Sequence, residues 1–209
     1  MNIEEKKALF EEFCQFLDSK EPVNETIDVQ RTVTIETDEY EVGDVITFSL
    51  TTGEVVSAMA VRREEDGMLF VFVDCLVNEY PMNEENTNKS GYEGCDLRKT
   101  LNTEILATFP NSIKSRMKPV YKDDKLRLLT AMEVFGENEY GDEDNGVLLP
   151  LMKYRKNRIA FQGKGTDEWE WYWLQNVYSA SNFANVANHG VADYYSASYS
   201  LGVRPAFKI

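Results

Sequence analysis

Apolar residues recur at helical spacing near the start of the chain and alternate with polar residues over much of the remaining sequence. Between Ile3 and Leu17 the apolar positions fit a period of 3.6 residues, with Glu and Lys on the opposite face. Pro22 would end such a helix. We therefore predict an amphipathic helix within residues 1–22, followed by one domain over residues 23–209.

The next part of the chain has the pattern of β-strands. Three short stretches are rich in β-branched residues and are bounded by turn-forming residues. These predicted strands are Thr32–Ile35, Val45–Phe48 and Val55–Val56. The run from Met68 to Val73 is apolar at every position, which indicates a central strand that is buried on both faces.

The second half of the chain mixes long polar stretches with short regular elements. Asn78–Gly94 reads as a surface loop, and Asp96 can cap a helix that ends before Pro110. Lys125–Leu129 is predicted to be a strand, and Gly136–Gly146 an acidic loop. No repeat or linker divides the chain, so we expect one α+β domain with a twisted antiparallel sheet, few helices and long irregular loops.

Two features near the C-terminus are typical of a framework. Trp169, Trp171 and Trp173 alternate with other residues, which would place the three indoles on one face of a strand. Such a face can stack on sugars, but we favour the core for Trp171 and Trp173. Gly202–Phe207 reads as a terminal strand, in which Arg204 would hold a buried carboxylate or loop carbonyls.

Composition narrows the class of partner and the compartment. The formal net charge of -14 disfavours binding to nucleic acid or to anionic membrane surfaces. No uninterrupted apolar run opens the chain, so we expect neither a signal peptide nor a membrane span. The cysteines Cys14, Cys75 and Cys95 form no CxxC pair, which disfavours disulfides and zinc. We expect folding in a reducing cytoplasm, with use at a virion or cell surface left open.

The sequence offers little for catalysis. His189 is the only histidine, so catalytic triads and multi-histidine metal sites cannot be built. Gly136–Gly146 could ligate calcium through carboxylates, but its spacing does not fit the helix–loop–helix calcium pattern, and a solvated loop is the preferred interpretation. We therefore expect no enzyme activity, no catalytic residues, no metal and no cofactor.

The segment Asn176–Leu201 points instead to recognition. It contains no Lys, Arg, Glu, Gln, Met, Pro or Trp, and consists largely of Asn, Ser, Tyr, Ala, Gly and Val. Antibody loops use the same chemistry, because Tyr gives contact area at low entropic cost while Ser, Asn and Gly adapt their hydrogen bonds. His189, between Asn188 and Gly190, is predicted to lie at the exposed tip of a tight hairpin turn.

The C-terminal residues resemble a family of gut-bacterial and phage proteins that end in a Trp-Leu-Arg-Ser segment and close with Gly-Val-Arg-Pro-Ala-Phe. The resemblance covers roughly Glu41 to the C-terminus. The matching residues are Trp173-Leu174, Asn182-Phe183, Val186, Gly190, Ala197 to Leu201 and Gly202 to Phe207, with Leu97-Arg98, Leu101-Asn102, Leu128-Leu129 and Glu133 upstream. Gln175 and Asn176 replace the family's Arg-Ser, which puts one scaffold contact in doubt.

This resemblance implies a C-type lectin-like fold of the formylglycine-generating-enzyme branch. That branch also contains the variable proteins of diversity-generating retroelements, in which adenines of the C-terminal coding segment are mutated. Mutation of AAC codons cannot produce Lys, Glu, Gln, Met or Trp, and Asn176–Leu201 lacks all five. The calcium motifs of lectins and the active-site cysteine pair of the enzymes are missing, so the resemblance carries over no enzyme activity.

The resulting functional hypothesis is a non-enzymatic module that binds a protein or glycan ligand, such as a retroelement-diversified variable protein or a phage or bacterial adhesin. Phe183, Val186 and Gly190 would be framework. The expected ligand-binding residues are Tyr178, Ser181, Asn185, Asn188, His189, Asp193, Tyr194, Tyr195, Tyr199 and Leu201. The alternative is an oligomeric structural or interaction subunit assembled through the N-terminal helix.

Overall fold

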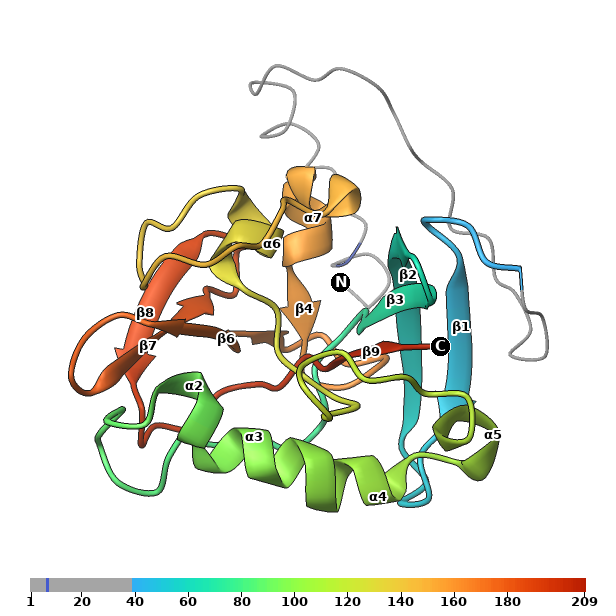
Figure 1. Ribbon diagram of the computed structural model, residues 1–209, viewed down its shortest axis with the longest axis horizontal. Coiled ribbons are helices and arrows are strands. Elements are labelled where there is room, and N and C mark those ends of the chain that lie inside the picture. The colour runs from blue at the N-terminus through green and yellow to red at the C-terminus, as the bar shows by residue number, and fades with distance from the viewer. Residues whose placement is uncertain (1–6, 8–38) are drawn as a thin grey trace.

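The structure, a computed structural model, describes Lys7 and residues 39–209 (Figure 1). The predicted helix within residues 1–22, apart from Lys7, and the predicted strand Thr32–Ile35 lie outside the described residues. The Lys7 ammonium group lies 4.4 Å from the centre of the Phe161 ring. No helix in the described part of the chain is long and apolar enough to cross a membrane.

A four-stranded antiparallel sheet forms one end of the molecule. Its strands are β1 (Val45–Ser49), β2 (Val55–Glu64), β3 (Gly67–Phe72) and β9 (Ala206–Lys208), in the order β1-β2-β3-β9. The predicted strands at Val45 and Val55 are confirmed, although β2 continues well beyond Val56. The apolar run that begins at Met68 is the interior strand β3, which pairs with β2 on one side and β9 on the other.

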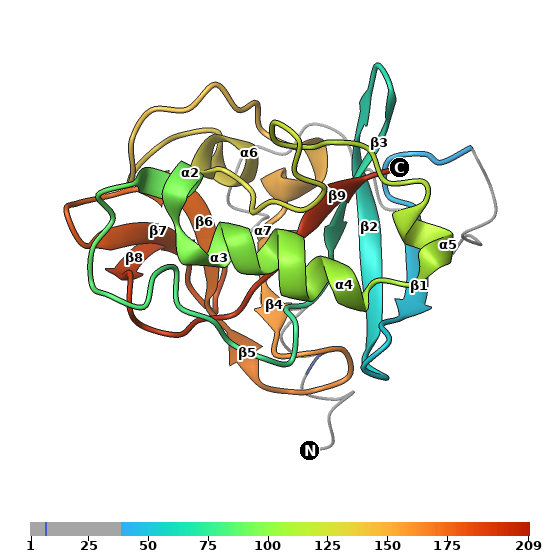
Figure 2. The same cartoon turned by 60° about the horizontal axis from the view of Figure 1, so that its bottom comes forward.

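A three-stranded antiparallel sheet forms the other end (Figures 1 and 2). It consists of β6 (Tyr172–Val177), β7 (Asn182–Val186) and β8 (Ala192–Ser196), with β8 at the edge. A small hairpin of β4 (Ala160–Phe161) and β5 (Trp169–Glu170) precedes it. The mixed architecture confirms the expected α+β class with antiparallel sheets and few helices.

Helices are short and connect the two sheets. A continuous helical segment made of α3 (Asp96–Thr100), η1 (Leu101–Ile105) and α4 (Leu106–Thr108) runs along the bottom of the molecule in Figure 1. The helical elements are α2 (Gly91–Gly94), α3 (Asp96–Thr100), η1 (Leu101–Ile105), α4 (Leu106–Thr108), α5 (Asn111–Lys114), α6 (Ala131–Phe135), η2 (Pro150–Lys153) and α7 (Arg155–Arg158).

The helix predicted after Asp96 is confirmed, but its cap is not Asp96. The Cys95 Sγ accepts a hydrogen bond from the Arg98 N–H at 3.4 Å, and Cys95 has extended backbone geometry. The Asp96 carboxylate instead accepts the N–H of Glu84 at 3.3 Å. The helix therefore begins one residue earlier than the sequence suggested, and Asp96 fastens the preceding loop to it.

Strand β3 separates two hydrophobic cores. Phe70 and Phe72 face the core that extends under the helices, where Phe70 stacks on Phe207 with ring centroids 5.6 Å apart. Leu69 and Val71 face the second core, which continues to the three-stranded sheet. Both faces of β3 are therefore buried, which explains the uninterrupted apolar sequence of this strand.

The predicted strand Lys125–Leu129 is wrong, because its backbone groups bond mostly to side chains. Only Arg127 forms a β-bridge, to Ala206. Two other N–H groups donate to the Asn102 Oδ1 at 2.9 and 3.0 Å, and a third donates to the Tyr92 hydroxyl at 3.1 Å. The segment is buried from Leu126 to Leu129 without becoming part of a sheet.

The C-terminal segment is a framework, as expected, although its strand is shorter. Strand β9 begins at Ala206 rather than at Gly202. Arg204 is buried, and its guanidinium donates to the Phe72 and Asn157 carbonyls at 2.6 and 2.9 Å and to the Tyr172 hydroxyl at 3.1 Å. The side chain therefore joins elements of both sheets through carbonyl and hydroxyl oxygens.

A buried ion pair anchors helix α6. Arg127 donates to both carboxylate oxygens of Glu133 at 2.6 and 2.7 Å. Glu133 also completes a capping box with Thr130, the residue before α6. Although burial alone would raise it, the Arg127 charge holds the pKa of Glu133 below its usual value.

We predict that Glu133→Ala lowers the free energy of unfolding by about 3–5 kcal/mol, because it leaves the Arg127 charge buried without its partner. Denaturant unfolding measures this loss. Lys99→Ala, which removes an exposed pair with Asp96, is the control and should cost about 1 kcal/mol or less. Equal losses in the two variants would contradict the anchoring role of Glu133.

Candidate functional site

The Asn/Ser/Tyr-rich segment forms most of the three-stranded sheet, and its framework residues are where the sequence placed them. Phe183 and Val186 are completely buried in β7. Gly190 has a φ of +79° in the turn between β7 and β8, a conformation that favours glycine. These three residues fix the hairpin whose second strand, β8, is the sheet edge.

The expected ligand-binding residues differ widely in exposure. The four tyrosines are the most consistently exposed of them: Tyr178 by 42%, Tyr194 by 38%, Tyr195 by 42% and Tyr199 by 52%. His189 is also exposed, and Ser181, Asn188 and Asp193 are half-buried. Eight of the ten residues thus reach the surface to some degree.

Asn185 and Leu201 do not belong to a contact surface. Asn185 is completely buried in the middle strand, opposite Trp173 on one side and Asp193 on the other. Its amide has no hydrogen-bond partner among the described residues. Leu201 is 4% exposed and forms a bridge to Tyr80. Both sequence-based assignments are wrong, because polarity and position in the segment do not reveal the middle strand.

The exposed tyrosines form two groups rather than one. Tyr178 and Tyr194 lie with ring centroids 4.2 Å apart, and Tyr140 packs on them at 5.4 and 5.1 Å. We call Tyr140, Tyr178 and Tyr194 the tyrosine platform. Tyr195 and Tyr199 form a separate pair at 4.4 Å. Because Tyr194 and Tyr195 are neighbours in a strand, the two groups lie on opposite faces of the sheet edge.

Tyr140 was not among the expected binding residues, since it comes from the acidic loop. This loop follows α6 and passes beside β8 (Figure 1). The Asp142 carboxylate accepts the N–H of Val177 at 2.9 Å, and the Asp142 N–H donates to the Val177 carbonyl at 2.8 Å. The loop is exposed over most of its length, as predicted, and it is also hydrogen-bonded to β6.

Asn176 is the main contact between the loop and the sheet. Its buried amide accepts the N–H of Ala131 at 2.8 Å and donates to the Asp142 carbonyl at 2.9 Å and the Asp144 carboxylate at 2.8 Å. Its neighbour Gln175 donates to the Leu128 carbonyl at 2.6 Å. The two residues that depart from the Arg-Ser pair of similar proteins thus make scaffold contacts of their own.

Asp144 serves the loop itself. Its carboxylate accepts hydrogen bonds from Thr130 Oγ1 at 3.0 Å and from the Gly146 N–H at 2.7 Å. Within residues 39–209 and Lys7, no group of three or more His, Cys, Asp or Glu side chains is placed to hold a metal ion. The observed role of Asp144 is to fold the loop against the start of α6.

His189 lies in the predicted hairpin turn, away from both tyrosine groups along the strand. Its Nδ1 lies 3.0 Å from the Asn188 Oδ1. The carbonyl of Gly190 accepts a hydrogen bond from the Arg158 Nε at 3.0 Å, so the turn is held against α7. The expected surface therefore has a turn region and a tyrosine region, connected by β8.

The tryptophan prediction is half correct. Trp173 is buried, as expected, whereas Trp171 is 38% exposed and Trp169 is 41% exposed. The assignment of Trp171 to the core is wrong, and so is the prediction of one face for all three indoles. Trp171 lies between β5 and β6, and burial stops alternating there, because Tyr172, Trp173 and Leu174 are all buried.

The burial of Glu170 produces an unusual carboxyl group beside the C-terminal segment. Its Cγ lies so close to Gly202 that a Cβ there would be only 2.4 Å away. Burial, and then the negative charge of Glu79, raise the pKa of Glu170 to about 7. Burial also raises the pKa of the thiols of Cys75 and Cys95, the latter to about 11, which disfavours the nucleophilic thiolate.

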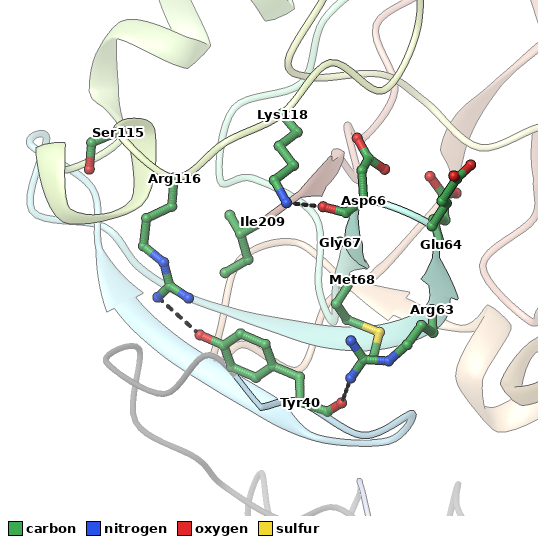
Figure 3. A pocket seen from close by; sticks show the side chains of 11 residues that line it. Tyr40, Arg63, Glu64, Asp66, Gly67, Met68, Ser115, Arg116, Lys118 and Ile209 are labelled. Atoms are coloured by element: carbon green, nitrogen blue, oxygen red, sulfur yellow. Dashed lines mark hydrogen bonds between the residues drawn. The ribbon is translucent and has the colours of Figure 1, made fainter.

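A pocket of about 620 Å³ lies elsewhere, between the β2–β3 turn, α5 and Ile209 (Figure 3). Its cationic groups already have partners: Arg116 donates to the Tyr40 hydroxyl at 3.2 Å, Arg63 to the Tyr40 carbonyl and Lys118 to the Asp66 carbonyl. None of the expected ligand-binding residues lines this pocket.

Comparison with known proteins identifies the family but no function. Residues 66–209, more than half of the chain, match the family model described as Domain of unknown function (DUF6273). This range includes strands β3 to β9, the acidic loop and the Asn/Ser/Tyr-rich segment. No curated protein and no solved structure matched the chain.

We predict that Glu170→Gln changes how stability depends on pH. A carboxyl group whose pKa is raised in the folded state stabilises the protein fully below the unfolded value, near 4.5, and loses that contribution as pH rises through about 7. Relative to the wild type, the variant should therefore gain stability between pH 4.5 and 8, as measured by urea unfolding at each pH.

Glu104→Gln removes the same charge from an exposed helical position and controls for net charge. A stability difference between Glu170→Gln and the wild type that stays constant across this pH range would contradict the assignment of a protonated, buried Glu170.

Proposed function

We propose that this chain, which belongs to the DUF6273 family, is a non-enzymatic ligand-binding module. The ligand would contact the exposed edge of the three-stranded sheet together with the acidic loop that lies against it. The observation that carries this proposal is the exposure of Tyr178 at the end of β6 and of Tyr194, Tyr195 and Tyr199 on or next to the edge strand β8.

The division between framework and contact residues supports this proposal. Phe183, Val186 and Gly190 are buried within the hairpin, whereas the four tyrosines before and after this stretch of the chain are exposed. Tyrosine is enriched among the residues that dominate binding energy, since it offers a large amphipathic surface with few rotatable bonds. Rings already packed on one another lose little further freedom when a ligand covers them.

The edge of β8 favours contact through side chains over the addition of a strand. The Asp193 carboxylate accepts the N–H of Tyr194 at 2.8 Å. This hydrogen bond satisfies a backbone donor that an incoming strand would need, a common protection of sheet edges. A ligand is therefore expected to dock on the tyrosine rings.

We extend the proposal to the fold family and the biological role. The resemblance of the closing Gly-Val-Arg-Pro-Ala-Phe segment to C-type lectin-like proteins of the formylglycine-generating-enzyme branch suggests a variable protein of a diversity-generating retroelement, or a phage or bacterial adhesin. The antiparallel sheets and long loops are compatible with that fold. The neighbouring DNA would test the retroelement link through a reverse transcriptase gene and a near-copy of the coding segment for residues 176–201.

Site-specific photo-crosslinking in the native cells tests the binding role. Benzoylphenylalanine in place of Tyr199 should crosslink to one defined partner, because this side chain is the most exposed of the four tyrosines. The same amino acid in place of Val55, which is exposed on the four-stranded sheet, should not. The absence of a partner specific to position 199 would contradict the proposal.

Tyr195→Ala tests whether a tyrosine contributes to the affinity for that partner. We expect a loss of about 1–3 kcal/mol in binding free energy with nearly unchanged thermal stability, the behaviour of a residue that dominates binding energy. A large fall in melting temperature would instead assign this ring to the core and would remove it from the contact surface.

A further inference from the structure

The tyrosine platform exposes aromatic rings at the surface. Tyr178 and Tyr194 are tilted by 33° to each other, and Tyr140 meets Tyr178 nearly at a right angle, at 87°. Two of the three side chains are exposed by about two-fifths, and Tyr140 is half-buried between them and the loop. The face of an aromatic ring carries partial negative charge, which attracts cations.

The platform lies among carboxylates. The acidic loop, residues 136–146, contains five Asp and Glu residues, and residues 176–201 add Asp193, while neither segment contains a Lys or Arg. The two segments thus carry six of the chain's 36 acidic residues and none of its 22 basic ones. Six negative charges in segments without a basic residue make this the kind of surface that attracts cationic partners.

Local electrostatics at Tyr140 point the same way. The negative charge of Glu139 raises the pKa of the Tyr140 phenol, and Asp193 and Tyr178 act in the same direction. Of these groups, the Glu139 and Asp193 carboxylates carry negative charge at neutral pH. Their charge would favour a positive charge placed beside the rings.

The shape of the surface favours a macromolecular partner. Small-molecule sites are usually concave and enclose most of their ligand. The platform is an outward-facing group of rings at a sheet edge, and the pocket between the β2–β3 turn and α5 is lined by none of its residues. An open aromatic surface with an acidic surrounding fits a side chain that projects from another protein.

We propose that the tyrosine platform receives a Lys or Arg side chain from an exposed cationic segment of a protein partner. The ammonium or guanidinium group would lie over Tyr178 and Tyr194, with the Glu139 and Asp193 carboxylates beside it. This proposal rests on the ligand-binding function proposed above and specifies the chemistry of the partner.

A fluorescent peptide of alternating Arg and Gly serves as the probe, and its binding to the full chain is followed by anisotropy at physiological ionic strength. Charges farther apart than about 8 Å are then largely screened, so binding reports local contacts more than net charge. The same peptide with citrulline in place of Arg keeps the size and planarity of the side chain but lacks the charge. We expect the Arg peptide to bind and the citrulline peptide not to bind.

Tyr194→Leu keeps an apolar side chain but removes the ring, and should weaken binding of the Arg peptide about three- to thirtyfold. The double variant Glu139→Gln, Asp193→Asn should weaken it at least as much. Trp171→Leu removes an exposed aromatic ring outside the platform, and Glu104→Gln removes an exposed charge. Both controls should leave the affinity unchanged, and thermal melting verifies that each variant is folded.

Three results would overturn the proposal: no binding by the wild type, equal binding of the citrulline peptide, or an equal loss with Trp171→Leu. Photo-crosslinking separates this failure from that of the proposed function. A partner crosslinked at position 199 together with no binding of the Arg peptide would retain the ligand-binding role and reject the cationic partner.

Discussion

The buried side-chain amide of Asn176 joins the three segments from which the proposed binding surface is made. Its oxygen accepts the first N–H group of α6, and its nitrogen donates to Asp142 and Asp144 in the acidic loop. An unsatisfied buried amide would cost about 1–3 kcal/mol, so the strand, helix and loop are fixed together. Gly141 fits against this residue, since a Cβ there would lie 2.4 Å from the Asn176 Cβ.

This junction brings residues that are distant in sequence onto one surface. Because the loop is held against β6, Tyr140 reaches the rings of Tyr178 and Tyr194, which project from the end of β6 and from the edge strand. The exposed tyrosines lie outside the hairpin framework of Phe183, Val186 and Gly190. The proposed binding function depends on this separation between framework and surface side chains.

The sequence predicted the elements that depend on local patterns. The apolar run of β3, the helix before Pro110 and the turn at Gly190 are all present, since periodicity and a glycine in a left-handed conformation are local properties. Predictions failed where contacts between residues distant in the sequence determine the structure. Lys125–Leu129 is bonded by Asn102 and Tyr92 side chains rather than by a strand. Asn185 is polar but is buried in the middle strand of its sheet. Trp171 is exposed because it lies between β5 and β6, next to the buried Glu170. Tyr140 lies between Glu139 and Gly141 in the acidic loop, and no sequence pattern predicted its contact with tyrosines of residues 176–201.

Amide hydrogen exchange, measured with and without the partner identified through position 199, shows whether the acidic loop and residues 176–201 act as one contact surface. We expect the partner to slow exchange in both residues 136–146 and residues 176–201, and to leave exchange in the β2–β3 turn unchanged. Protection in the tyrosine-rich segment alone, or at the pocket beside α5 instead, would contradict a binding surface built from these two segments.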